Sequence, residues 1–259
     1  MLPSEIASGV LIAFEGIDGS GKTTQAALLR DWVQGLGFEV VSTKEPTAGQ
    51  WGAKIRNSKF SSRLPPQEEL ECFVHDRQEH VEKLIAPALS RGAVVVVDRY
   101  YYSTAAYQGA RGLPVKDVLE MNRAFAPTPD IVFLLDLDPK TGLERIAGRG
   151  QGQDLFETLE ELTKAREIFR RIAMEAQHVV YIDAAQTEAE VHAEVIFNLV
   201  RGPMMSRMHE LGRHLEIPKE DPDYELLELA QSLTADPKVP FQEKIRRLLT
   251  YSNKKRHPH

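Results

Sequence analysis

Short apolar runs alternate with longer amphipathic stretches along the first 200 residues of the chain. The runs predict buried strands at Val10–Phe14, Phe38–Ser42, Ala93–Val97, Ile131–Asp136 and Val179–Ile182. Helical spacing predicts helices at Thr23–Leu36, Pro66–Ser90, Val115–Phe125, Pro139–Ala147, Leu155–Ala176 and Glu188–Val200. Strands that alternate with helices indicate an α/β domain, in which helices cover both faces of a parallel sheet.

The pattern changes after Val200, where Gly202 and Pro203 end the last of these helices. The rest of the chain has no further strand pattern. Two amphipathic stretches, Tyr224–Leu233 and Phe241–Tyr251, predict helices behind Asp-Pro turns. We therefore expect an α/β domain over 1–201 and a small helical C-terminal extension over 202–259. The apolar faces of the extension should pack on the domain or, alternatively, on a second copy of the chain.

The bulk composition narrows the class of protein. The chain has 259 residues, of which 42% are hydrophobic, as in an ordinary globular protein. A formal net charge of −6 disfavours a nucleic-acid partner. No apolar run approaches the ~20 residues of a membrane span, and the N-terminus lacks the pattern of a secretory signal. The single cysteine, Cys72, fits a cytoplasmic location and lies in a helical apolar pattern that predicts a core residue.

Residues 16–23, Gly-Ile-Asp-Gly-Ser-Gly-Lys-Thr, match the phosphate-loop pattern G-x-x-x-x-G-K-[ST] in full. A predicted strand precedes them and a predicted helix follows, which is the context that this motif requires. Backbone N–H groups and the helix N-terminus then favour a triphosphate, with Lys22 at its β- and γ-phosphates and Thr23 on Mg²⁺. The expected ATP-binding residues are Gly16, Ile17, Asp18, Gly19, Ser20, Gly21, Lys22, Thr23 and Thr24.

Asp98 and Arg99 follow the predicted strand of four consecutive valines. They lie at the carboxyl end of that strand, where ligands bind in sheets of this kind. A carboxylate there can complete the shell of Mg²⁺, so Asp98 joins Thr23 as an expected metal residue. Arg99 is then available to an anionic substrate or to the phosphoryl group in transfer. The alternative interpretation is a salt bridge at the end of the strand.

Further motifs resemble the thymidylate kinase family, whose members phosphorylate dTMP to dTDP. The segments that carry the resemblance are Phe14–Gln25, Lys44–Pro46, Cys72–Arg77, Asp98–Gly109 and Pro129–Arg145, within roughly residues 8–200. The resemblance implies a phosphate-loop kinase fold, with a five-stranded parallel sheet in the order 2-3-1-4-5. It also implies Mg²⁺-dependent transfer of the γ-phosphoryl group of ATP to dTMP, and a homodimer.

The resemblance assigns an acceptor site as well. Phe73 would stack on thymine, and Arg77, four residues later on the same helix face, would hydrogen-bond the base edge. Asp18 would bind the 3′-hydroxyl, and Tyr107 would crowd the 2′ position and so disfavour ribonucleotides. Each of these side chains also has a purely structural interpretation, in the core or in an ion pair. The expected substrate-binding residues are Asp18, Glu45, Pro46, Arg56, Phe73, Arg77, Arg99, Ser103, Thr104, Tyr107 and Gln108, with a cis bond before Pro46.

Residues 145–157 resemble the family's mobile lid, which closes over the phosphates and excludes water. The expected catalytic residues are Lys22, Arg99, Arg145 and Arg149. Relatives carry an arginine either in the phosphate loop or in the lid, and Gly19 places this chain in the second group. Ala147 and Leu155, however, stand where relatives have arginine. Two alternatives therefore stay open: a related kinase for another deoxynucleotide or a nucleoside, and a nucleotide-binding module with weak turnover.

Overall fold

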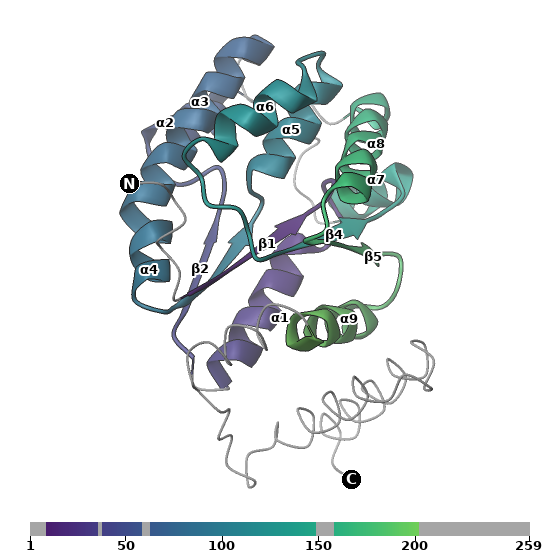
Figure 1. Ribbon diagram of the computed structural model, residues 1–259. Coiled ribbons are helices and arrows are strands. Elements are labelled where there is room, and N and C mark those ends of the chain that lie inside the picture. Colours follow the sequence, from purple (N-terminus) through teal and green to yellow (C-terminus); the bar gives the residue numbers. More distant parts are fainter. Residues whose placement is uncertain (1–8, 36–37, 59–62, 149–157, 202–259) are drawn as a thin grey trace, which may run out of the picture.

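Five parallel strands form one sheet in the order β2-β3-β1-β4-β5, as predicted (Figure 1). The computed structural model describes residues 9–35, 38–58, 63–148 and 158–201, and the statements below concern these residues. The strands are β1 (Val10–Glu15), β2 (Val40–Lys44), β3 (Val94–Asp98), β4 (Ile131–Asp136) and β5 (Val179–Asp183). All five predicted strands are confirmed. The one whose start differs most, β2, begins at Val40 instead of Phe38.

Helices cover both faces of the sheet (Figure 1). On one face lie α1 (Lys22–Gly35) and α9 (Glu188–Arg201), and on the other lie α4 (Ala86–Ser90), α5 (Tyr101–Ala110) and α8 (Leu159–Glu175). The remaining described helices are α2 (Gln50–Ser58), α3 (Pro66–His80), α6 (Val115–Arg123) and α7 (Pro139–Ala147). None of the described helices is long and apolar enough to cross a bilayer.

The helix predicted over Pro66–Ser90 is continuous but changes its winding. Helix α3 passes into a π-helical turn, η2 (Val81–Ile85), and then into α4. In this turn the N–H of Ala86 donates to the carbonyl of Val81, five residues earlier. The next residue, Pro87, has no N–H to donate, and a widened turn is one way in which a helix accommodates a proline.

Two helices were not predicted, α2 and α5. Helix α5 is the more informative, because it contains three tyrosines, a threonine and a glycine, all of which are mediocre or poor helix formers. It packs extensively against α8, so tertiary contacts stabilise a helix that local propensity does not. The predicted lid residues 149–157 and the predicted extension 202–259 lie outside the described residues.

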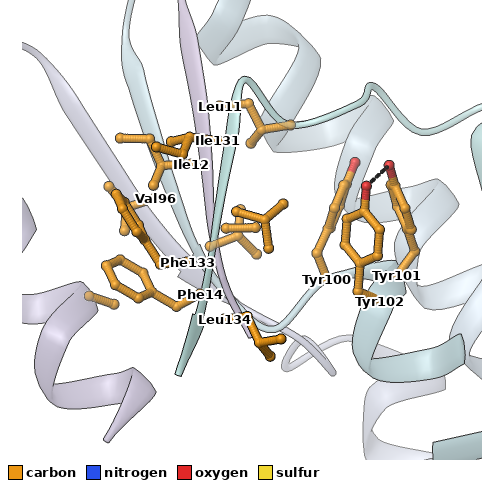
Figure 2. Close-up of a cluster of buried hydrophobic side chains, with 14 of the residues drawn as sticks. Leu11, Ile12, Phe14, Val96, Tyr100, Tyr101, Tyr102, Ile131, Phe133 and Leu134 are labelled. Carbon is orange, nitrogen blue, oxygen red and sulfur yellow. Dashed lines mark hydrogen bonds between the residues drawn. The ribbon is translucent and has the colours of Figure 1, made fainter. Parts of the chain in front are cut away.

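The core lies on both sides of the central strands. Phe14 and Phe133 contact each other on one side, with ring centroids 5.3 Å apart, while Tyr100, Tyr101 and Tyr102 pack on the opposite side (Figure 2). Burying a large apolar side chain contributes about 1.5–3 kcal/mol, so this cluster holds β1 and β4 firmly in register. Cys72 is buried, which confirms the predicted core position. A rigid sheet therefore carries the loops at its carboxyl edge.

Candidate active site

A hollow of about 100 Å³ lies at the carboxyl edge of the sheet, where β1 and β3 end. The register pairs Phe14 with Asp98, so the phosphate loop after β1 and the turn after β3 lie side by side. The hollow is lined by Asp18, Gly19, Gly21, Lys22, Thr23, Thr24, Asp98 and Arg99. Every one of these residues belongs to the predicted site.

The phosphate loop packs against the ends of other elements. A side-chain carbon on Gly16 would lie 2.4 Å from the carbonyl oxygen of Leu135, and one on Gly19 would lie 2.4 Å from that of Gly142. Only glycine permits these approaches. Lys22 is buried, and its Nζ donates to the carbonyl of Ile17 across the loop at 2.8 Å. Burial, and next the positive charge of Arg99, lower the pKa of Lys22 to about 8.

Thr23 and Asp98 meet as the metal prediction requires. The hydroxyl of Thr23 donates to Oδ2 of Asp98 at 2.5 Å. The other carboxylate oxygen, Oδ1 of Asp98, is buried and has no hydrogen-bond partner among the described residues. An unpaired carboxylate oxygen beside a hydroxyl is the oxygen-donor chemistry that Mg²⁺ takes, so the residues fit this ion. The described residues contain no cluster of three or more His, Cys, Asp or Glu side chains suited to a metal.

Asp18 connects the phosphate loop to the turn after β3 and to helix α5. Arg99 forms an ion pair with Asp18, and the Tyr107 hydroxyl donates to Oδ2 of Asp18 at 3.2 Å. The Arg99 guanidinium also lies over the Tyr107 ring, 5.3 Å from its centroid, and donates to Oγ of Ser103 at 3.2 Å. An ion pair for Arg99 was the alternative interpretation. The structure shows such a pair, and it joins two residues that were both predicted to bind substrate.

A second polar cluster lies between α3 and α5. Arg77 is buried and its guanidinium donates to Glu45, to Oδ1 of Asn122 at 2.6 Å and to Oγ1 of Thr104 at 3.0 Å. Gln108 donates from Nε2 to Glu69 at 2.6 Å, while its Oε1 is buried without a partner among the described residues. The structure therefore brings together four predicted substrate residues: Glu45, Arg77, Thr104 and Gln108. Phe73 lies half-buried one helical turn before Arg77.

The Glu45–Pro46 peptide bond is cis, as expected. Behind it, Arg56 donates from Nη1 to the carbonyls of Pro46 at 3.2 Å and Thr47 at 2.6 Å. Asp76 accepts from both the N–H and the hydroxyl of Thr47, at 2.7 and 2.6 Å. Arg56 and Asp76 thus shape this turn from two different helices.

Sequence reasoning missed three buried polar residues of this region: Glu69, Asp76 and Asn122. Glu69 and Asp76 follow helical spacing with the buried residues of α3, and Asn122 lies four residues after the buried Val118 of α6. A charged or amide side chain on the apolar face of an amphipathic helix was the signal that could have found them.

Arg145 reaches the phosphate loop from α7. Its Nη1 donates to the carbonyls of Ala184 at 3.2 Å and Gly19 at 3.5 Å. Ala147 is exposed at the end of the same helix. Arg149 and Leu155 lie outside the described residues, so Arg145 is the predicted lid cation that the structure places.

Comparison with known proteins identifies the family. A family model for thymidylate kinase matches residues 14–195. The "Thymidylate kinase" of Xanthomonas oryzae pv. oryzae (strain PXO99A) is 50% identical over 190 residues, which cover 73% of this chain and 83% of that protein. That of Xylella fastidiosa (strain M12) is 46% identical over 200 residues, or 77% and 88% of the two chains. The match spans the phosphate loop, the Asp98–Arg99 turn and the cluster around Arg77, and the chain belongs to the thymidylate kinase family.

Proposed function

We propose that the chain transfers the γ-phosphoryl group of ATP to dTMP and gives ADP and dTDP. The observation that carries the proposal is the contact of Asp18 with both Arg99 and Tyr107. This contact places the phosphate loop directly beside the residues expected to bind the acceptor. A donor phosphate and an acceptor phosphate can therefore meet in line. The names of the relatives support dTMP as the acceptor.

The donor side is assembled from the phosphate loop and its neighbours. The loop N–H groups and Lys22 would hold the phosphates, and Thr23 and Asp98 would hold Mg²⁺. When bound, the ion neutralises part of the phosphate charge. A triphosphate would also compensate the buried charge of Lys22. Arg99, Arg145 and Arg149 would stabilise the negative charge that develops during transfer.

The acceptor side favours a base with a carbonyl next to an N–H. Four of the five guanidinium N–H groups of Arg77 bind protein atoms, and the fifth would donate to the base carbonyl. The buried Oε1 of Gln108 would accept from the N–H beside it. Thymine and uracil offer this pair of groups, whereas cytosine presents an acceptor in place of the N–H. Phe73 would stack on the ring.

A coupled assay of ADP release tests the proposal with dTMP, dUMP, dCMP, thymidine and no acceptor, each with and without Mg²⁺. We expect the highest kcat/KM for dTMP, a loss of about tenfold or more for dCMP because the Gln108 acceptor is left unpaired, and no turnover without the ion. A better substrate among the other acceptors would contradict it, and so would ATP binding without turnover. These two results correspond to the two alternatives that the sequence left open.

We further propose residues 1–201 as the kinase unit, with a lid at about 145–157, and 202–259 as a helical extension. The family match ends at residue 195, which supports this division. The resemblance also favours a homodimer and a cytoplasmic location. The same assay on a chain that ends at Arg201, with light scattering of the full chain, tests the division and the dimer. Loss of turnover by a folded truncated chain would place part of the site in the extension.

A further inference from the structure

Glu15 is a buried carboxylate to which neither the sequence analysis nor the proposed mechanism gives a role. It ends β1 and directly precedes the first glycine of the phosphate loop. Its side chain is fully buried. One oxygen, Oε1, accepts from the backbone N–H of Tyr100 at 2.8 Å and of Ser103 at 3.2 Å, and Oε2 accepts from the Ser103 hydroxyl.

These bonds cap helix α5 from β1, although the strand that precedes α5 in the chain is β3. Tyr100 is the N-cap residue and provides no side-chain cap of its own. Glu15 instead accepts from the N–H of Tyr100, and it shares the N–H of Ser103 with the carbonyl of Tyr100, which lies 3.1 Å from that nitrogen. Burial disfavours the charged form of the carboxylate and raises the pKa of Glu15 to about 7, in spite of these bonds and the nearby Arg99. A serine or aspartate at position 100 would cap the helix without this cost, so capping alone does not explain a buried Glu15.

The turn that Glu15 holds contains Arg99, which has a φ of 69°, in the left-handed region. Such a conformation costs a residue with a side chain about 1–3 kcal/mol unless neighbouring contacts enforce it. Here the N–H of Arg99 donates to the carbonyl of Phe14 at 3.0 Å, and Glu15 holds the N–H of Tyr100. The last two residues of β1 therefore fix the backbone on both sides of Arg99.

Glu15 is also linked to the guanidinium of Arg99 through the hydroxyl of Ser103. The Ser103 hydroxyl gives its proton to Glu15 and accepts from Nη1 of Arg99 at 3.2 Å. The other terminal nitrogen of Arg99 binds Asp18. A continuous series of bonds thus runs from Glu15 through Ser103 and Arg99 to Asp18 in the phosphate loop.

We propose that Glu15 is a positioning residue for phosphoryl transfer: it sets the backbone and guanidinium of Arg99 so that this cation faces the phosphates beside Asp18. The proposal rests on the proposed function for the identity of the acceptor, but not for the geometry of Arg99. Glu15 itself does not line the hollow beside the phosphate loop. Its contribution should therefore be seen in the chemical step and in acceptor binding, not in the affinity for ATP.

The variant Glu15→Gln tests the proposal. The amide oxygen can still accept from both N–H groups, but the amide NH₂ now donates to Ser103. The Ser103 proton must then turn toward Arg99, which repels it. We expect kcat/KM for the best acceptor to fall about 10- to 100-fold, as a misplacement of up to about 1 Å would cause. The Kd of ATP, measured by calorimetry, should change by less than about twofold, and Ser103→Ala should weaken kcat/KM in the same direction.

Tyr102→Phe is the matched control. Tyr102 lies on the same helix, is buried, and its hydroxyl is hydrogen-bonded to Nε2 of His178 at 2.5 Å. Its removal should lower the melting temperature while leaving both kcat and KM unchanged. If Glu15→Gln instead keeps normal kinetics, or lowers the melting temperature and weakens ATP to the same extent as it slows turnover, Glu15 is structural and the proposal is wrong.

A crystal structure of Glu15→Gln separates this inference from the proposed function. The Arg99 guanidinium should be displaced from its place beside Asp18 in the variant, whichever acceptor the wild-type chain prefers. An Arg99 in its original place would contradict the inference even if dTMP proves to be the substrate. A displaced Arg99 in a chain that does not use dTMP would support the inference and contradict the proposed function.

Discussion

Gly19 and Gly142 lie backbone to backbone where the phosphate loop meets the start of α7. A side-chain carbon on Gly19 would lie 2.4 Å from the Gly142 carbonyl oxygen, and Gly19 also has a φ of +81°. An arginine at this loop position, the other arrangement in the family, would therefore be both strained and obstructed. Arg145, three residues after Gly142, instead brings a cation to the loop from α7. The close backbone contact therefore disfavours a charged side chain in the loop, and the cation at this place comes from α7.

The substitution Gly142→Ala tests this contact. Its side-chain carbon would lie 2.7 Å from the carbonyl oxygen of Asp18, so α7 or the loop must move by a few tenths of an ångström. Helical φ suits alanine here, so the effect is steric. We expect kcat/KM for ATP to fall about tenfold, because Arg145 moves with α7. Thr141→Ser, which removes a methyl group from the neighbouring position, should leave it unchanged. Equal kinetics for both variants would mean that the contact tolerates the methyl group.

At the scale of elements, periodicity predicted all five strands, because each is a short apolar run bounded by turns. The phosphate loop and the Asp98 turn were also predictable, since their chemistry is local in sequence. The polar cluster around Arg77 was not, because Glu45 follows β2, Arg77 lies in α3 and Asn122 lies in α6, and no spacing connects them. Only the family resemblance assigned Arg77 a role. Helix α5 was missed because its cap, Glu15, comes from β1 and its stability comes from α8.

Packing and propensity make opposite predictions for Gly109→Ala in α5. Helix propensity favours alanine by about 1 kcal/mol. The new carbon, however, would lie 2.6 Å from Cγ2 of Val115 and 3.0 Å from Cδ1 of Ile168. Overpacking of this kind costs about 1–3 kcal/mol, so we expect net destabilisation in urea unfolding. Gly148→Ala, with 3.5 Å to its nearest neighbour, should cause none.

A second substitution shows whether the clash is the cause. Val115→Ala removes the atom nearest to the new carbon, so the double variant should be less destabilised than the sum of the two single changes. Strict additivity would mean that the loss in Gly109→Ala has another origin.

At the scale of the whole molecule, the buried Glu15 and the half-buried His178, which lie at opposite ends of the sheet, have opposite effects on the stability of the fold as pH falls. Burial raises the pKa of Glu15 from 4.5 to about 7. The folded state therefore binds more protons than the unfolded state between these values, and this group stabilises the fold as pH falls. Burial, and next the charge of Arg123, lower the pKa of His178 below 6.5. The unfolded state then binds more protons, so this group destabilises the fold as pH falls below 6.5.

The variant Glu15→Gln separates the two contributions. The variant loses the stabilisation that protonation of Glu15 provides and keeps the destabilisation that comes from His178. The wild-type protein should therefore become more stable relative to the variant as pH falls from 8 to 5. Protonation over the full interval from about 7 to 4.5 is worth at most about 3 kcal/mol. Urea unfolding of both proteins at pH 5, 6, 7 and 8 measures the difference. The lowest pH of this series, 5, stays above the pH range in which Asp136 titrates. Three hydrogen-bonding neighbours lower the pKa of Asp136 to about 2 in spite of its burial. Parallel stability curves would show that the Glu15 carboxyl does not take up its proton in this interval.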